Sequence, residues 1–408
     1  MRPVARIAPR PWMMAPATRA VTAALSAEGA TVRFVGGCVR DAVLGRDAKD
    51  VDLATPDPPE TVIALLEAAG LKAVPTGIAH GTVTAVVDGT PFEVTTLRRD
   101  VETDGRHAKV AFTDDWVADA ARRDFTLNAM YCDADGTLYD PVGGIEDARQ
   151  GRVRFVGDAR ARIEEDALRL LRFFRFHAHY GRGEADATAL AACRELAPLL
   201  ANLSGERLRD ETLKLLAAPE PAPVVALMID MGVLGQVLPE VAGVGALAAL
   251  CAIEGDAADP LRRLACLLRD GQGGAERVAK RLRLSNADAK RLAALTTPAV
   301  ALAADDDVRA QRRALYRVGR ALFVDLVYLA WAAAPGDAGA FRAMLATAAD
   351  WEDPALPVKG ADVAALGVPA GPEIGRLLAA VEAWWQDGDY HAGRAEALET
   401  LKALKDAG

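Results

Sequence analysis

The chain has 408 residues, of which 51% are apolar and 26% are charged. This balance is typical of a globular protein, and it excludes a mini-protein and a wholly disordered chain. With 48 Lys and Arg against 57 Asp and Glu, the formal net charge is −9. That charge excludes a basic coat for nucleic acid over the whole surface, but not a local basic groove, because charge can be segregated along a chain.

The cysteines and the apolar segments disfavour several further classes of protein. The five cysteines are odd in number and have no C-x-x-C spacing, so neither a disulfide framework nor a zinc ribbon is expected. The basic N-terminal segment lacks the apolar core of a signal peptide, and no run of about 18 apolar residues predicts a membrane span. We therefore expect a cytoplasmic protein without membrane contact.

The first part of the chain, to about residue 150, carries most of the strand signals. Helices are expected between these strands, and the whole predicts a small α/β head with a mostly antiparallel or mixed sheet. The turn Asp88-Gly89 should join two of the strands. The expected strands are residues 32–35, 50–53, 82–88 and 92–97, and the expected helices are 18–28, 39–44 and 59–69.

The strand signals stop after about residue 155. Residues 160–180 predict one long helix, with Leu168, Leu171 and Phe174 at helical spacing. Most of the remaining chain is rich in Ala and Leu with helical periodicity. The architecture expected is therefore a head followed by an all-helical remainder of roughly 250 residues.

Two aspartates give the sharpest chemical signal. Asp50 and Asp52 are two apart in an expected strand, so their side chains should lie on the same face. Two carboxylates held there repel each other unless a cation lies between them. Oxygen ligands of this kind suit Mg²⁺, usually completed by water and substrate phosphates.

A phosphate site is expected beside the metal site. Gly36-Gly37 ends a strand and opens a helix, where free backbone amides favour a phosphate. Arg40, about one turn later, can add a charge-assisted hydrogen bond. Glu93, on the strand after the Asp88-Gly89 turn, could be a third carboxylate at the metal or an exposed strand residue, and both interpretations stay open.

Five ordered motifs within residues 30–216 resemble the class II tRNA nucleotidyltransferases (CCA-adding enzymes) and the related bacterial poly(A) polymerases. The motifs are Gly-Gly-x-Val-Arg-Asp with the D-x-D, residues 122–129 (RRDFTLNA), 140–147 (DPVGGIED), 165–172 (EDALRLLR) and 204–216 beginning SGER. The resemblance implies an α+β protein with a polymerase-β-like head, here residues 1–150, a helical neck at 151–216, and a helical body and tail at 217–408.

The resemblance also implies an activity. The protein would add C, C and A stepwise to the 3′ end of tRNA without a template, from CTP and ATP and with release of pyrophosphate. Asp50 and Asp52 would hold two Mg²⁺ ions, and no obligate protein partner is inferred. Poly(A) polymerases carry a basic run after the D-x-D, whereas residues 73–97 contain no Lys or Arg, which favours the CCA-adding branch. A partial C- or A-adding enzyme and a non-catalytic RNA-binding protein also stay open as interpretations.

The neck offers the chemistry to select a base. Residues 151–182 carry eight Arg and four acids, a local charge of +4. Cytosine and adenine both present an amino donor beside a ring-nitrogen acceptor. A carboxylate next to a guanidinium, as Asp166 and Arg169 supply, would accept both bases and reject uracil and guanine. The competing interpretation is an ordinary i, i+3 ion pair. Arg172 and Arg175 continue the same expected polar stripe.

A second motif completes the expected nucleotide site. Arg123 suits a triphosphate oxygen and Asp124 suits a sugar hydroxyl, and Asn128 would reach the same ribose if the segment is helical. Residues 98–107 are charged and poor in apolar side chains, which predicts a mobile loop. In the resembled family such a loop helps the change from C to A addition, while the composition alone fits a solvated loop equally well.

Overall fold

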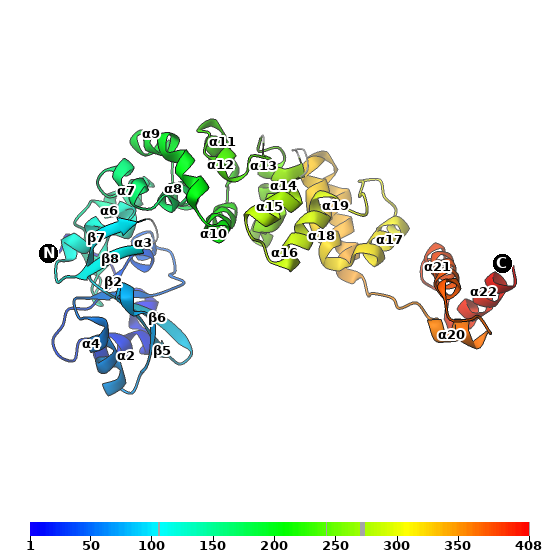
Figure 1. The fold of residues 1–408 in the computed structure, drawn as a ribbon, viewed down its shortest axis with the longest axis horizontal. Coiled ribbons are helices and arrows are strands. Elements are labelled where there is room, and N and C mark those ends of the chain that lie inside the picture. Colours follow the sequence, from blue (N-terminus) through cyan, green and yellow to red (C-terminus); the bar gives the residue numbers. More distant parts are fainter. Residues whose placement is uncertain (105–106, 242, 270–273, 408) are drawn as a thin grey trace. The chain divides into compact units, whose positions relative to one another are not determined.

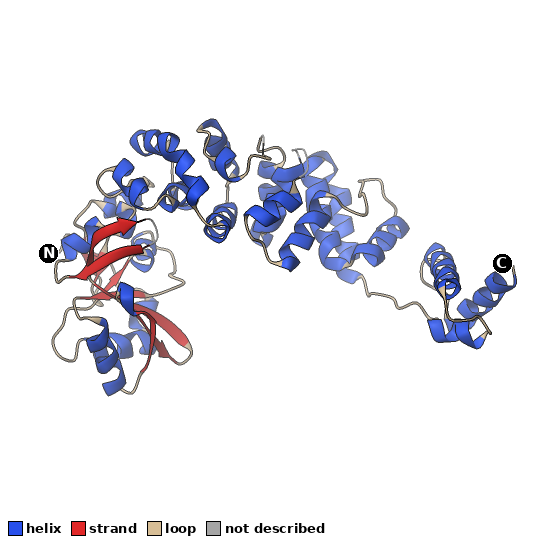
Figure 2. Ribbon diagram, viewed as in Figure 1, coloured by secondary structure: helices blue, strands red, loops and turns tan. Residues whose placement is uncertain are grey.

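The computed structural model describes residues 1–408 except 105–106, 242, 270–273 and 408. The chain forms two compact units. The first contains Met1–Val244 together with Arg281–Arg283, and the second contains Gly245–Lys280 and Leu284–Gly408. Strands are confined to the first part of the chain and helices make up the rest (Figures 1 and 2), as the sequence predicts.

The head of the first unit is built on an eight-stranded mixed sheet in the order β1-β10-β9-β2-β3-β6-β5-β4. Neighbouring strands pair antiparallel except β3 and β6, which are parallel. The strands are β1 (Ala5–Arg6), β2 (Arg33–Val35), β3 (Asp52–Thr55), β4 (Lys72–Gly77), β5 (Thr82–Val87), β6 (Thr90–Thr96), β9 (Tyr131–Cys132) and β10 (Thr137–Tyr139). The mixed sheet and the turn at Asp88-Gly89 are confirmed.

Helices α2 and α4 pack on strands β5 and β6. Val21 and Leu25 of α2, and Leu66 of α4, are fully buried in this contact, as the apolar periodicity predicts. Helix α3 carries Arg40, and α5 ends just before Arg123, two residues of the site described below. The helices of this part are α1 (Pro11–Met14), α2 (Pro16–Leu25), α3 (Gly37–Val43), α4 (Pro59–Ala68), α5 (Trp116–Ala121) and α6 (Gly144–Gln150).

The segment expected to be a mobile loop forms a β-hairpin instead. Strands β7 (Arg98–Asp104) and β8 (His107–Phe112) pair antiparallel as a separate two-stranded sheet. The composition did not reveal this pairing, because the backbone N–H and C=O groups of two extended segments satisfy each other whatever charges the side chains carry. Residues 105–106 lie outside the described residues.

The expected single helix over residues 160–180 is also wrong, because two helices are present. Helix α7 (Ala159–Glu165) ends where Asp166 adopts an extended backbone with φ −152° and ψ 105°. Helix α8 (Leu168–Tyr180) begins two residues later. The Asp166 carboxylate accepts a hydrogen bond from the Leu168 backbone N–H at 3.1 Å. A short acidic side chain that bonds to the backbone in this way competes with helix continuation.

The rest of the first unit is helical. Helix α10 packs along α8, and α11 also contacts α8. Gly205 at the start of α10 lies against the Arg281 carbonyl, so residues 281–283 dock on this unit. The helices are α9 (Ala187–Leu196), α10 (Gly205–Leu216), α11 (Ala222–Asp230) and α12 (Leu234–Val237).

The second unit is helical throughout its described residues. One core gathers around Phe323, Phe341 and Met344, and a smaller one lies around Leu377 and Leu401. Its helices are α13 (Leu247–Glu254), α14 (Pro260–Arg269), α15 (Ala275–Arg281), which runs into the first unit, α16 (Asn286–Thr296), α17 (Val308–Val318), α18 (Arg320–Ala333), α19 (Ala338–Asp350), α20 (Gly360–Ala365), α21 (Pro372–Asp387) and α22 (Arg394–Asp406).

Within the described residues, no single helix has the length and apolar composition needed to cross a membrane. One pair of helices, Arg320–Ala333 with Pro335–Asp350, meets the criteria of length and composition only when taken together, and the pair is bent by 118°.

Candidate active site

Asp52 and Glu93 are direct neighbours in the sheet. Asp52 opens β3 and Glu93 lies opposite it on the parallel strand β6. Asp50 precedes the strand, in a bend, and is exposed. The expectation that Asp50 and Asp52 share a strand face is therefore wrong. Strand β2, the antiparallel partner of β3, ends at Val35, so residues before Asp52 have no strand beside them on that side.

The three carboxylates nevertheless act on one another. Burial raises the pKa of Asp52 to about 6 with help from the charges of Glu93 and Asp50, while Arg123 acts in the opposite direction. A carboxylate that is costly to ionise among other carboxylates is stabilised by a cation. Carboxylate oxygens are the donors that a hard divalent ion prefers. Among the described residues, no three His, Cys, Asp or Glu side chains are already gathered as a metal site.

The Gly36-Gly37 turn is placed beside two guanidinium groups. Gly36 has φ 73°, in the region that favours glycine. A Cβ placed on Gly36 would lie 3.8 Å from Nη1 of Arg123, and one on Gly37 would lie 3.6 Å from Nη2 of Arg40. The structure thus brings together a side-chain-free turn and two cations, an arrangement suited to phosphate oxygens.

Arg40 is already engaged by protein groups. It is buried, donates two 3.0 Å hydrogen bonds to the Asp41 carboxylate, and donates a third to the Asn128 Oδ1 at 2.8 Å. Arg123 differs, because its Nε and Nη2 donate to Asp119 at 3.2 and 2.9 Å while Nη1 is the nitrogen beside Gly36. The two guanidinium groups therefore differ, since that of Arg123 places Nη1 beside the Gly36 turn, whereas all three nitrogens of Arg40 donate to Asp41 or Asn128.

Asp124 and Asn128 form a bridge between the glycine turn and the neck. Asn128 lies in a 3₁₀ turn, Thr126–Asn128, and its Nδ2 donates to Asp124 at 3.3 Å. Asp124 also accepts a 2.7 Å hydrogen bond from Nε of Arg172 on α8. Burial alone would raise the pKa of Asp124, but the Arg172 charge and hydrogen bonds outweigh it and hold that pKa below its usual value.

Asp166 and Arg169 do not form the i, i+3 ion pair that their spacing allows. Asp166 is held by Arg207 of α10, whose Nη2 donates to both carboxylate oxygens at 2.9 and 2.7 Å. Arg169 is paired with Glu165 and also donates to the Arg122 carbonyl at 3.2 Å. The expected polar stripe is also interrupted, since Asp166 lies in the break before α8 rather than on the helix.

Arg172 and Arg175 share one buried carboxylate, Glu211 of α10. Nε of Arg175 donates to Glu211 at 2.6 Å, and Arg172 lies 3.9 Å from it. Glu211 is 4% exposed. Helix α10 therefore presents Arg207 and Glu211, one turn apart, to oppositely charged partners in the neck. Both lie in the 204–216 motif, but their contacts with the site were not predicted.

Comparisons with known proteins agree with this geometry. Residues 32–154 match the family model described as "Poly A polymerase head domain", and residues 186–243 match "Probable RNA and SrmB- binding site of polymerase A". The chain is 35% identical over 402 residues to CCA tRNA nucleotidyltransferase 1, mitochondrial, of Mus musculus, covering 94% of this chain and 89% of that protein. The chain belongs to the CCA tRNA nucleotidyltransferase family.

Two further relatives support this assignment to the CCA tRNA nucleotidyltransferases. The CCA-adding enzyme of Geobacillus thermodenitrificans is 43% identical over 223 residues, which cover 54% of each chain. The crystal structure of the Bacillus stearothermophilus CCA-adding enzyme in complex with CTP superposes with a TM-score of 0.81 at 30% identity, covering 98% of this chain and all of that one. The expected family and the α+β fold with a polymerase head and helical remainder are confirmed.

Most of the predicted site residues lie in one group in the structure. Gly36, Gly37, Arg40 and Arg123 lie together, and Asp124, Asn128 and Arg172 adjoin them through hydrogen bonds. Of the carboxylates, Asp52 is linked to this group electrostatically, because the charge of Arg123 opposes the rise in the pKa of Asp52. Asp166 lies in the break between α7 and α8, and Arg169 lies in the first turn of α8. The role of each of these residues stays a prediction.

Proposed function

We propose that this protein adds C, C and A in turn to the 3′ end of tRNA, using CTP and ATP and no template. In each step the tRNA 3′-oxygen bonds to the α-phosphorus, the bond to the β-phosphate bridging oxygen breaks, and pyrophosphate leaves with that electron pair. The proton of the 3′-hydroxyl is released to solvent. The observation that carries the proposal is Asp52 beside Glu93, next to a glycine turn flanked by Arg40 and Arg123.

We propose Mg²⁺ as the divalent ion that this family requires, with Asp50 and Asp52 as its protein ligands and Glu93 as a third carboxylate. The ions would lower the pKa of the attacking hydroxyl and neutralise the leaving pyrophosphate. The protein's part is to hold Asp52 and Glu93 side by side on two central strands of the sheet, where burial first, and the charges of Glu93 and Asp50 second, raise the pKa of Asp52.

The other residues bind and orient the nucleotide. Nη1 of Arg123 binds a phosphate oxygen beside Gly36. Asp124 and Asn128, joined to each other and anchored by Arg172, offer oxygen and amide groups to the ribose. Asp166 accepts from the amino group of cytosine or adenine, while Arg169 donates to the adjacent ring nitrogen. Arg207 fixes the Asp166 carboxylate before a base arrives.

The decisive experiment uses tRNA transcripts that end before CCA, after C, or after CC. Purified protein is incubated with CTP, ATP or both, and the products are resolved at single-nucleotide length. Growth to full CCA supports the proposal. A long A tail would identify a poly(A) polymerase, C or A addition alone a partial enzyme, and no extension with retained tRNA binding a non-catalytic RNA-binding protein.

Asp166→Ala should reduce discrimination between CTP and UTP more than it reduces nucleotide binding. Wrong bases leave buried polar groups unpaired at about 1–3 kcal/mol each, so losing the carboxylate should narrow the selectivity by roughly tenfold or more. The measurement is the ratio of kcat/KM for CTP and UTP on one tRNA acceptor. An unchanged ratio contradicts base recognition and leaves only the ion pair with Arg207.

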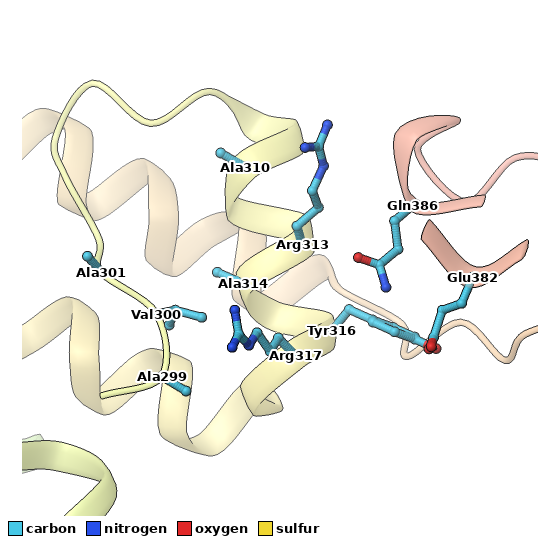
Figure 3. Close-up of a pocket in the computed structure, with 10 residues that line it drawn as sticks. All are labelled: Ala299, Val300, Ala301, Ala310, Arg313, Ala314, Tyr316, Arg317, Glu382 and Gln386. Carbon is cyan, nitrogen blue, oxygen red and sulfur yellow. The ribbon is translucent and has the colours of Figure 1, made fainter. Parts of the chain in front are cut away.

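Binding of tRNA requires a positively charged surface, and helix α17 contributes one. This helix carries four arginines and no acidic residue. Arg309, Arg313 and Arg317 are spaced four apart, so they lie along one face, and all three are exposed. A cavity of about 830 Å³ lies between α17 and α21, and Arg313 and Arg317 line it (Figure 3). We infer that this face contacts tRNA phosphates.

Replacing these three arginines with glutamine should weaken tRNA binding and make it less dependent on salt. For every phosphate that the variant no longer binds, the slope of log affinity against log salt should fall by roughly 0.7–0.9. The measurement is tRNA affinity at four salt concentrations, with Arg6→Gln as a control for an exposed arginine on the first unit. A slope equal to that of the parent would show that α17 does not bind the RNA backbone.

For the compartment, we propose the cytoplasm. The mouse relative is mitochondrial by name, so microscopy of a fluorescent fusion of the full chain in its own cells would decide between the two.

A further inference from the structure

One acidic residue of the head has a position that neither the sequence motifs nor the proposed mechanism uses. Asp119 lies on α5, and only 1% of its side chain is exposed. A buried carboxylate is costly unless its oxygens are paired and hydrogen-bonded. Burial alone would raise the pKa of Asp119, but the charges of Arg123 and Arg122 outweigh burial and hold that pKa well below its usual range.

The two oxygens of Asp119 serve different partners. Oδ2 accepts from Nε and Nη2 of Arg123 and from the Tyr131 hydroxyl, the last at 2.7 Å. Oδ1 accepts from Nε and Nη2 of Arg122 at 2.9 and 2.7 Å, and from the backbone N–H of Arg98 at 3.3 Å. Arg98 is the first residue of β7, so the same carboxylate also fixes the base of the β7–β8 hairpin.

The pairing with Arg123 sets the direction of that guanidinium. A guanidinium is planar, so engaging Nε and Nη2 from one side determines where Nη1 lies. Here Nη1 lies beside Gly36, 3.8 Å from the place that a Cβ would take. The ring of Tyr131 supports the arrangement, with the Arg123 guanidinium carbon 5.6 Å from its centre.

We propose that Asp119 is a positioning residue for the triphosphate: it holds Arg123 so that Nη1 meets a phosphate oxygen at the Gly36-Gly37 turn. This inference rests on the proposed function, since it needs a nucleoside triphosphate at that turn. It predicts a specific defect in which affinity for phosphates falls while recognition of base and ribose is retained.

The test compares CTP with CMP, which shares the base and ribose but lacks the β- and γ-phosphates. In the full-length Asp119→Asn variant, affinity for CTP should fall about tenfold, because a misdirected Arg123 loses a charge-assisted hydrogen bond. Affinity for CMP should change less than about twofold. Both dissociation constants are measured by calorimetry with magnesium, and equal losses for CTP and CMP, or no loss for CTP, would overturn the proposal.

Asp133 provides a matched control elsewhere in the head. Like Asp119 it accepts from an arginine, Arg33 at 3.0 Å, and from a tyrosine hydroxyl, Tyr139 at 2.7 Å. Asp133→Asn should leave the affinities for CTP and CMP unchanged. If Asp133→Asn produces the same selective loss, general loosening of the head rather than Arg123 is responsible, and the proposal is wrong.

A second pair of variants keeps the test valid if Asp119→Asn does not fold. Tyr131→Phe removes one hydrogen bond to Oδ2 without removing charge, and should lower CTP affinity about twofold to threefold with CMP affinity unchanged. An unchanged ratio of CTP to CMP affinity would contradict the proposal. In a protein that already carries Arg123→Ala, adding Tyr131→Phe should not change the ratio of CTP to CMP affinity any further. If Tyr131→Phe lowers that ratio as much in this background as in the parent, the positioning role of Asp119 is also contradicted.

The parent protein separates this inference from the proposed function. If the parent fails to extend tRNA by CCA, the proposed function is wrong whatever the binding ratios are. If the parent extends tRNA normally but Asp119→Asn and Tyr131→Phe keep the parent's preference for CTP over CMP, only the role of Asp119 is wrong.

Discussion

Asp52→Ala and Asp50→Ala should each abolish nucleotide addition while the protein stays folded. Both carboxylates are proposed as ligands of the ions that activate the attacking hydroxyl and neutralise pyrophosphate, so losing either should reduce the rate at least about a hundredfold. The measurement is single-turnover addition of C to a tRNA acceptor at saturating CTP and magnesium. Activity above about a hundredth of the parent in either variant would contradict the role of that aspartate.

The stability of these variants provides the control on folding. The pKa of Asp52 is raised to about 6, so the folded state binds its proton more tightly than the unfolded state does. Ionised Asp52 therefore opposes folding at pH 7, and its contribution becomes less unfavourable as pH falls through 6 toward the usual aspartate range. In metal-free buffer at pH 7, Asp52→Ala should melt no lower than the parent. Glu67→Ala, an exposed acid on α4, should change neither activity nor melting.

The sequence predicts best what depends on neighbouring residues. The strand before Gly36-Gly37, the hairpin turn at Asp88-Gly89 and helix α4 were all expected, because alternation, turn chemistry and a proline at a helix start act locally. The position of Asp50 depends instead on where another strand ends, at Val35. The alternation of polar and apolar residues does not show where a neighbouring strand ends. The prediction that Asp50 and Asp52 share a strand face was therefore wrong, although the charge of Asp50 does help to raise the pKa of Asp52.

The site's support depends on residues far apart in the chain. Asp166 meets Arg207 and Arg175 meets Glu211, 41 and 36 residues away. Asp166 and Glu211 each have another arginine closer in the sequence, Arg169 and Arg209 respectively. Sequence spacing therefore predicts the wrong ion pairs. The break at Asp166 was missed for a related reason. Its backbone hydrogen bond stops α7, while the apolar periodicity continues across the break.

The helices of the second unit are expected to carry most of the affinity for tRNA. A fragment of residues 1–283 should still bind CTP but should lose most of its tRNA affinity. The end point follows from the structure, because residues 281–283 dock on the first unit: Arg281 is paired with Glu240, and Arg283 with Glu206. A shorter fragment ending near residue 220 would remove α11, which packs on α8 and so supports the neck.

The physical reason is that three arginines of the neck are already committed to carboxylates. Arg169, Arg172 and Arg175 are paired with carboxylates of the neck and head. The acceptor arm of tRNA needs other cations, and those of α17 lie in the second unit. Losing residues 284–408, which make up most of the second unit and include α17, should weaken tRNA binding at least about tenfold at moderate salt, with a shallower dependence of log affinity on log salt.

Both proteins are titrated with the same tRNA at several salt concentrations, and CTP affinity is measured in parallel to show that the fragment is folded. A fragment that binds CTP normally and binds tRNA with the parent's affinity and salt slope would show that the first 283 residues hold both substrates. The arginines of α17 would then have to be exposed for another reason. If the fragment keeps its CTP affinity but loses tRNA affinity and shows a shallower salt slope, the first unit selects and joins the nucleotide and the second unit binds the RNA.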